Sequence, residues 1–112
     1  MEDRVKKHLE DILLAIDEIE MFFDGKPKMY DDFVQNILLR RGIERNITII
    51  GEAMNRILKE QPDIQITNAR KIVDARNYAI HGYDSLTADI IWMIVIKHLP
   101  ILKTEVIQLI ED

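Results

Sequence analysis

Cysteine is absent from this chain of 112 residues. Without cysteine the protein can form no disulfide framework and can use no thiolate in catalysis, which is compatible with a reducing cytosol. The histidine, aspartate and glutamate residues show no spacing that is typical of a metal site, and no glycine-rich phosphate loop is present. The sequence therefore predicts neither a resident metal nor a nucleotide cofactor.

Long apolar runs are also missing. The longest, residues 90–96, lies between Asp89 and Lys97 and is far too short to span a bilayer. The first four residues, MEDR, are mostly charged and lack the apolar block of a secretory signal. We therefore expect a soluble cytoplasmic protein, and the length predicts a single domain over residues 1–112.

The chain has no excess of basic residues, because its formal net charge is −5. Proteins that bind long nucleic acids usually present a basic surface, so this charge argues against extensive phosphate contact. It does not exclude the cleavage of RNA at a small cleft. Two local groups of cations are predicted to be solvated helix faces: Arg40, Arg41 and Arg45, and Arg70, Lys71 and Arg76. His8 and His98 lie among charged residues and are also predicted to be exposed.

What the sequence does contain is helical periodicity. Apolar residues recur at spacings of four and three along the first segment, which predicts one amphipathic helix. We expect Asp3 to be its N-cap, and Gly25 followed by Pro27 to end it. The stripe consists of Val5, Leu9, Ile12, Ile16, Ile19 and Phe23.

The next segment is ambiguous. Residues 24–29 are predicted to form a loop, and a second helix is expected from Tyr30 to about Arg41. Gly42 should weaken that helix, and a new apolar stripe starts at Ile43 and continues to residue 57. The pattern leaves open whether residues 30–60 form one kinked helix or two, and Pro62 ends the helical segment in either case.

Two further helices complete the pattern. Thr67 or Asn68 can cap a fourth helix, Gly82 can end it, and its apolar positions are Ala69, Ile72, Val73, Ala79 and Ile80. A last long helix begins after residues 84–85, and Pro100 should kink or split it. Its inner positions are Leu86, Ile90, Ile94, Leu99, Leu102, Val106 and Leu109. Since no alternating strand could pair with residues 90–96, we interpret that run as a doubly buried helix. The sequence thus predicts an all-α bundle of four to six helices.

The fourth helix contains one residue that does not fit a simple bundle. At about 100° per residue, Arg76 falls in the middle of its apolar arc, where a guanidinium is costly unless something pairs with it. Asn77 and His81 are four residues apart at the edge of that arc. Structural roles are the alternative: His81 as a helix cap, and Glu52 as the acidic partner of Arg76. Glu52 is also a candidate to pair with Arg45 or Arg56 inside the bundle.

The order Arg76, four residues, His81, one residue, Tyr83 is similar to the Arg-x4-His-x-Tyr signature of HepT-like toxins in the HEPN ribonuclease superfamily. Asn77 matches the polar residue favoured after that arginine. The stretch Ile49-Ile50-Gly51-Glu52-Ala53 resembles a second family segment, and Ile91-Trp92 with Leu99-Pro100 fits the family's closing helix. The resemblance covers nearly the whole chain.

The resemblance implies an HEPN-like fold and a metal-independent RNA endonuclease that works as a homodimer, with transfer or messenger RNA as candidate substrates. His81 would transfer protons, because an imidazole titrates near neutrality. Arg76 would hold the scissile phosphate, and Asn77 would orient it or the imidazole. The alternative is a non-catalytic helical dimer that serves as the substrate-binding companion of a nucleotidyltransferase.

The resemblance also implies a partner, a minimal nucleotidyltransferase antitoxin that silences the toxin by adenylylation of Tyr83. A bulky anionic group beside His81 and Arg76 would fill the cleft and occupy the arginine. Tyr83 could equally be a packing residue with a hydrogen-bonded hydroxyl.

Overall fold

The computed structural model describes residues 2–81 and 85–112, without the side chains of residues 81, 85 and 86. Over these residues the chain is helical and contains no strand, which confirms the predicted all-α class. The described elements are α1 (Asp3–Phe23), α2 (Tyr30–Gln35), α3 (Ile37–Glu60), α4 (Ala69–His81), α5 (Ser85–Met93), the π-helical segment η1 (Ile94–His98) and α6 (Leu99–Glu111).

Helix α1 follows its predicted stripe, because all six apolar positions are buried, and Ala15 joins them. The predicted cap is wrong by one residue: Asp3 lies in the first helical turn, and Glu2 is the N-cap without a side-chain hydrogen bond. The end of the helix agrees with the prediction. Asp24 and Gly25 both have positive φ, 51° and 73°, and the chain then leaves the helix through the loop 24–29.

Residues 30–60 form two helices, and the break lies at Asn36 rather than Gly42. Asn36 has extended backbone (φ −91°, ψ 100°), and its side chain accepts a hydrogen bond from the backbone N–H of Leu39 at 3.1 Å. This caps α3, which then runs through Gly42 to Glu60, two residues before Pro62. A Cβ atom at Gly42 would lie 2.9 Å from the Phe22 ring, so this glycine serves close packing inside a continuous helix.

The last predicted helix is split, as expected near Pro100. Proline has no N–H to donate, and its ring collides with a carbonyl four residues earlier in a regular helix. The π turn η1 precedes it, and the Leu99 N–H bonds to the Ile94 carbonyl five residues back. The run 90–96 is not doubly buried, however. Met93 and Ile96 are 50% and 40% exposed, because only one face of this segment meets the bundle.

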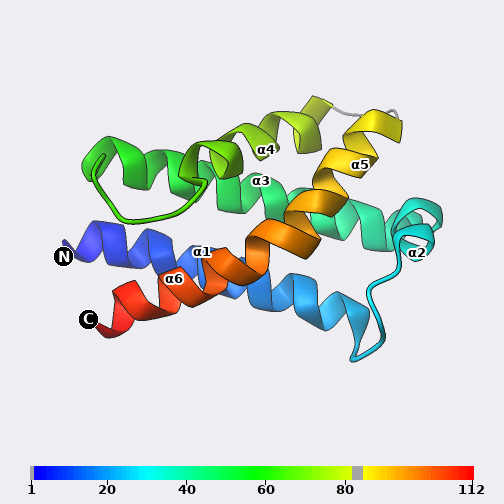
Figure 1. Cartoon of the computed structure of the whole chain (residues 1–112), viewed down its shortest axis with the longest axis horizontal. Helices are drawn as coiled ribbons and strands as arrows, with labels where there is room; N and C mark the ends of the chain where they lie inside the picture. Colours follow the sequence, from blue (N-terminus) through cyan, green and yellow to red (C-terminus); the bar gives the residue numbers. More distant parts are fainter. Residues whose placement is uncertain (1, 82–84) are drawn as a thin grey trace.

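Helix α3 is the centre of the bundle, with α1 packed along one side and α4 along another (Figure 1). The chain then crosses over this layer through α5 and η1, and α6 lies beside α1. Lys103 of α6 forms ion pairs with Asp17 and Glu20 of α1, which tie the closing helix to the first one. No helix in the described part of the chain is both long and apolar enough to cross a membrane.

Candidate functional site

The predicted site residues begin on α4, which packs along α3 (Figure 1). Arg76 is half-buried, and Asn77, one position later, is exposed. His81 is the last residue of α4, and its side chain lies outside the described part of the chain, as does Tyr83. The structure therefore places the arginine and the asparagine, whereas their convergence with His81 and Tyr83 stays a prediction.

Arg76 lies at a close contact between α4 and α3. A Cβ atom on Gly51 of α3 would be 2.7 Å from the Arg76 Cβ and 3.1 Å from the Ile72 carbonyl oxygen. The apolar arc around it is partly as predicted: Ile72 and Val73 are buried. Ile80, by contrast, is 43% exposed, and Ala75, which the pattern missed, is buried because it faces α5.

No carboxylate in the described part of the chain forms an ion pair with Arg76. The suggested partner Glu52 is exposed, and it pairs with neither Arg45 nor Arg56. Both structural roles considered for Glu52 are therefore wrong. The guanidinium of Arg76, half-buried and without a described carboxylate, is chemically available to an anion.

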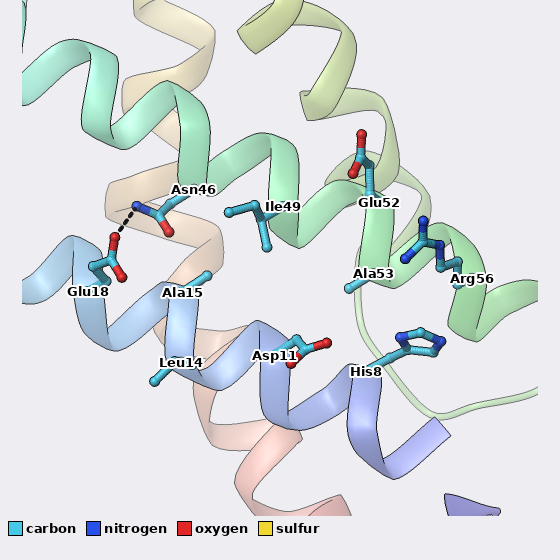
Figure 2. Close-up of a pocket in the computed structure, with 10 residues that line it drawn as sticks. All are labelled: His8, Asp11, Leu14, Ala15, Glu18, Asn46, Ile49, Glu52, Ala53 and Arg56. Carbon is cyan, nitrogen blue, oxygen red and sulfur yellow. Dashed lines mark hydrogen bonds between the residues drawn. The ribbon is translucent and has the colours of Figure 1, made fainter. Parts of the chain in front are cut away.

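Glu52 instead lines a polar groove between α1 and α3, together with Arg56, His8 and Asp11 (Figure 2). At its far end the buried amide of Asn46 donates hydrogen bonds to Glu18 Oε1 and to the Gly42 carbonyl. His8 is half-buried in this groove, so the prediction of an exposed side chain is wrong. Within residues 2–81 and 85–112, no group of three or more acidic or histidine side chains is arranged to hold a metal ion.

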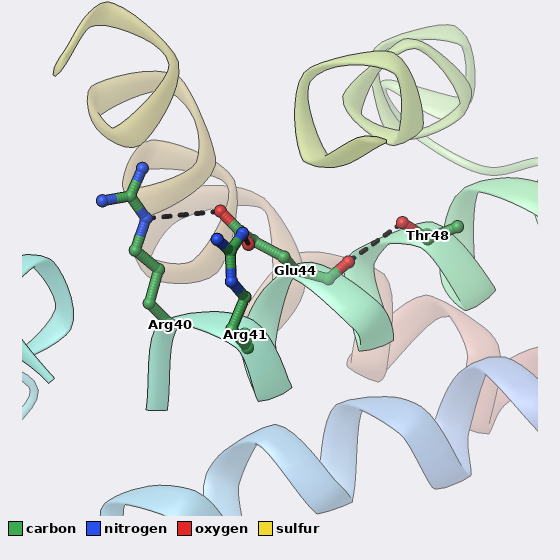
Figure 3. A network of polar contacts seen from close by, with 4 residues as sticks. All are labelled: Arg40, Arg41, Glu44 and Thr48. Atoms are coloured by element: carbon green, nitrogen blue, oxygen red, sulfur yellow. Dashed lines mark hydrogen bonds and ion pairs between the residues drawn. The ribbon is translucent and has the colours of Figure 1, made fainter. Parts of the chain in front are cut away.

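The carboxylate that the bundle does bury is Glu44, with a side chain only 6% exposed. Arg40 and Arg41 bond to its two oxygens at 3.3 Å and 3.0 Å, and Thr48 bonds to its backbone carbonyl (Figure 3). The prediction of a solvated face therefore fails for Arg40, which is 22% exposed, and holds for Arg41 at 63%. The signal was present in the sequence as acid–base pairs at spacings of three and four.

His98 was also predicted to be exposed, and it is half-buried instead. Burial, together with the charges of Lys71 and Lys97, lowers the pKa of His98 below its ordinary value of 6.5. The Asn68 side-chain nitrogen lies 3.4 Å from its Nδ1. His98 borders a shallow hollow that Tyr78 and Met93 also line, on the α5 side of α4.

An aromatic cluster fixes α2 against α5. Trp92 stacks on Phe33 with ring centroids 5.3 Å apart and meets Tyr30 edge-on at 6.0 Å. The Tyr30 hydroxyl donates to Asp89, and this hydrogen bond raises the pKa of Tyr30. The cluster therefore holds α5, the element that follows the predicted motif in the chain, in a defined place.

A model of the family described as "Ribonuclease HepT-like" matches residues 12–109. The matched range includes Arg76, Asn77, His81 and Tyr83 as well as the Gly51 contact. It therefore covers all three segments on which the resemblance rests and most of the bundle.

Several similar proteins carry ribonuclease names. One, from Methanocaldococcus jannaschii, is named "Gamma-glutamylcyclotransferase and putative RNase"; it is 30% identical over the whole of this chain, which spans only 50% of that relative. A second from the same organism, named "Putative RNase", is 32% identical over 91% of this chain and 93% of its own length. A third, from Caldanaerobacter subterraneus, has the same kind of name and is 30% identical over 73% and 74% of the two chains. No solved structure matches.

Proposed function

Because the chain belongs to the ribonuclease HepT-like family, we propose that it is a metal-independent RNA endonuclease and the toxin of a toxin–antitoxin pair. The family match over residues 12–109 is the observation that carries this proposal. The half-buried guanidinium of Arg76, which has no carboxylate partner among the described residues, supports it.

The chemistry proposed is attack of an RNA 2′-hydroxyl on the adjacent phosphorus, with loss of the 5′-oxygen. This reaction needs a base for the hydroxyl proton and an acid for the leaving oxygen. It also needs positive charge on the non-bridging oxygens as the transition state forms. In our proposal His81 moves the protons, Arg76 binds the phosphate, and Asn77 orients the phosphate or the imidazole.

A homodimer would complete such a site. One chain supplies one motif histidine and one motif arginine, and a two-fold axis beside the motif would supply a second pair. Arg76 and His81 are five positions apart on α4, about 140° around a regular helix, so one copy cannot easily direct both at one phosphate. A shared cleft removes this difficulty.

The regulatory part of the proposal concerns a minimal nucleotidyltransferase as the antitoxin. It would attach adenylate to Tyr83, two positions beyond His81, and the added negative charge would compete with RNA phosphate for Arg76. RNA, either transfer or messenger, is the proposed substrate class.

The second candidate is a non-catalytic dimer that binds substrate for a nucleotidyltransferase. The net charge of −5 favours this candidate, since it disfavours long contacts with nucleic acid. The half-buried Arg76, which has no carboxylate partner within the described residues, favours the nuclease, because a scaffold has no use for a costly guanidinium at a helix contact. We therefore rank the nuclease first.

The deciding experiment is incubation of the purified protein with short RNAs and with transfer RNA in excess chelator. Cleavage is expected in the chelator, and Arg76→Ala and His81→Ala should each lower its rate by about 100-fold or more. Arg70→Ala is the matched control, because Arg70 is an exposed arginine on the same helix. Absence of cleavage would favour the scaffold, and a wild-type rate in either motif variant would contradict the proposed mechanism.

A further inference from the structure

Gly51 lies at a close approach between α3 and α4. Three α4 atoms surround the space where its side chain would start: the Arg76 Cβ at 2.7 Å, and the Ile72 and Val73 carbonyl oxygens at 3.1 Å and 3.4 Å. Gly51 is buried, as are Ile50 and Ala53 on the same helix. Any side chain at position 51 would therefore meet α4 before it met solvent.

The atoms around Gly51 cannot move independently of their helix. In an α-helix the Ile72 carbonyl accepts the backbone N–H of Arg76, so a methyl group pressed against this oxygen pushes on that hydrogen bond. The Cβ of Arg76 is likewise fixed to the backbone. A substitution at Gly51 must therefore displace the α4 backbone at Arg76 itself.

Gly42, in the same helix, is a useful contrast. Its missing Cβ would be 2.9 Å from the far edge of the Phe22 ring, and its three nearest atoms all belong to that ring. Phe22 is 37% exposed, so its ring can turn away towards solvent without moving a helix. Both glycines have a nearest contact below 3.0 Å, but the nearest atoms at Gly42 belong to a side-chain ring, whereas those at Gly51 are backbone oxygens and the Cβ of the motif arginine.

We propose that Gly51 is a positioning residue, which sets the place of the Arg76 guanidinium by allowing the α4 backbone to rest directly on α3. The proposal deepens the nuclease function and rests on it. The place of the α4 backbone matters because a half-buried arginine has few other side-chain conformations that would bring its guanidinium to the same phosphate. A displacement of about 1 Å at a group that stabilises the transition state can lower a rate by about 100-fold.

The test compares Gly51→Ala with Gly42→Ala and Arg76→Ala in RNA cleavage, with Tm measured for each. We expect Gly51→Ala to lower kcat by at least about 10-fold, with a much smaller change in KM. Gly42→Ala should keep kcat within about twofold, since its methyl group displaces only the Phe22 ring. Backbone amide signals of Arg76 and Asn77 should shift in nuclear magnetic resonance spectra of Gly51→Ala and stay unchanged in Gly42→Ala.

The outcomes separate the two proposals. If Arg76→Ala cleaves RNA normally, the proposed function is wrong. If Arg76→Ala is inactive while Gly51→Ala keeps its kcat, or its Arg76 signals do not move, the positioning role is overturned and the nuclease survives. A Gly51→Ala chain that does not fold, beside a folded Gly42→Ala, would assign the glycine to folding alone and would also overturn the proposal.

Discussion

Two ionisable side chains, Glu44 and His98, are less exposed than their charged neighbours in the sequence would suggest. Glu44 lies under two arginines on α3, and His98 lies at the junction of η1 and α6. Both are at least half-buried, and each faces positive charge. For the carboxylate this environment is favourable, whereas for the imidazole it is unfavourable once a proton is bound.

The first prediction concerns Glu44→Gln. It should lower the free energy of unfolding by about 1–2 kcal/mol, because the amide carries no negative charge and offers the two arginines one acceptor oxygen instead of two, while the arginines can turn to solvent. Urea unfolding measures this loss. Glu52→Gln is the matched control on the same helix, since Glu52 is exposed and forms no ion pair with the residues that the structure describes, and it should change stability by less than about 0.5 kcal/mol. Equal effects of the two substitutions would contradict the assigned pairing.

The second prediction concerns pH. The pKa of His98 is lower in the folded chain than its ordinary value, so the unfolded chain binds the proton more tightly. Stability should therefore fall as pH drops below 6.5, the ordinary value, and level off below the folded pKa. His98→Gln should lessen the decrease in Tm between about pH 7.5 and pH 5. Lys71→Gln should lessen it too, by removing one of the two charges. An unchanged pH profile in both variants would refute this account.

At the scale of the helices, the breaks follow backbone chemistry more closely than residue propensity. Gly42 and Asn36 both disfavour helix, yet only Asn36 ends one. The Asn36 side chain accepts a hydrogen bond from a backbone N–H that has no carbonyl partner at the start of a helix, so it favours a helix end. Glycine has no such side chain, and inside a well-packed helix its backbone N–H already has a carbonyl partner. Pro100 acts through its own missing N–H, and the π turn before it accommodates the ring.

The third prediction is that Asn36→Ala destabilises the protein by about 1 kcal/mol, because the N–H of Leu39 loses its capping oxygen. Chemical unfolding followed by circular dichroism measures the change. Asn36→Asp retains an acceptor in the same place and should be close to the wild type. If Asn36→Ala is equally stable, the side chain does not hold the α2–α3 junction.

At the scale of the whole molecule, the fourth prediction is the homodimer. Solution scattering at tens of micromolar should give twice the monomer mass of 13.2 kDa. Arg76→Ala should remain dimeric, because a stable dimer interface buries far more surface than one side chain provides. A monomer at that concentration would contradict the shared cleft.

The fifth prediction concerns Tyr83. Protein co-expressed with its nucleotidyltransferase partner should gain the mass of one or more adenylate groups on the peptide that contains Tyr83. Tyr83→Phe should abolish the gain, and Tyr78→Phe, which alters a 42% exposed tyrosine on α4, should not. Modified protein should lose RNA cleavage and keep its dimer. Modification on Tyr78 or Tyr30 alone would refute the assignment of Tyr83 and would leave the nuclease proposal unaffected.

Much of the helical structure was predictable from the sequence. The stripe of α1, the loop 24–29, the stop before Pro62 and the split near Pro100 all follow from local rules. The motif order also indicated the family before any fold was known. These features are local in the chain, so spacing and backbone chemistry suffice to determine them.

The tertiary structure decided which predicted faces are buried and what each polar group meets. Periodicity shows that one face of a helix is apolar, but how far that face is buried depends on the neighbouring helices. Met93 and Ile96 are therefore exposed although they belong to the most apolar run. Tertiary packing also decides the burial of Glu44 and the contact between Arg76 and Gly51. Arg76 and Gly51 are separated by 25 positions in the chain, and only the packing of α4 on α3 brings them together.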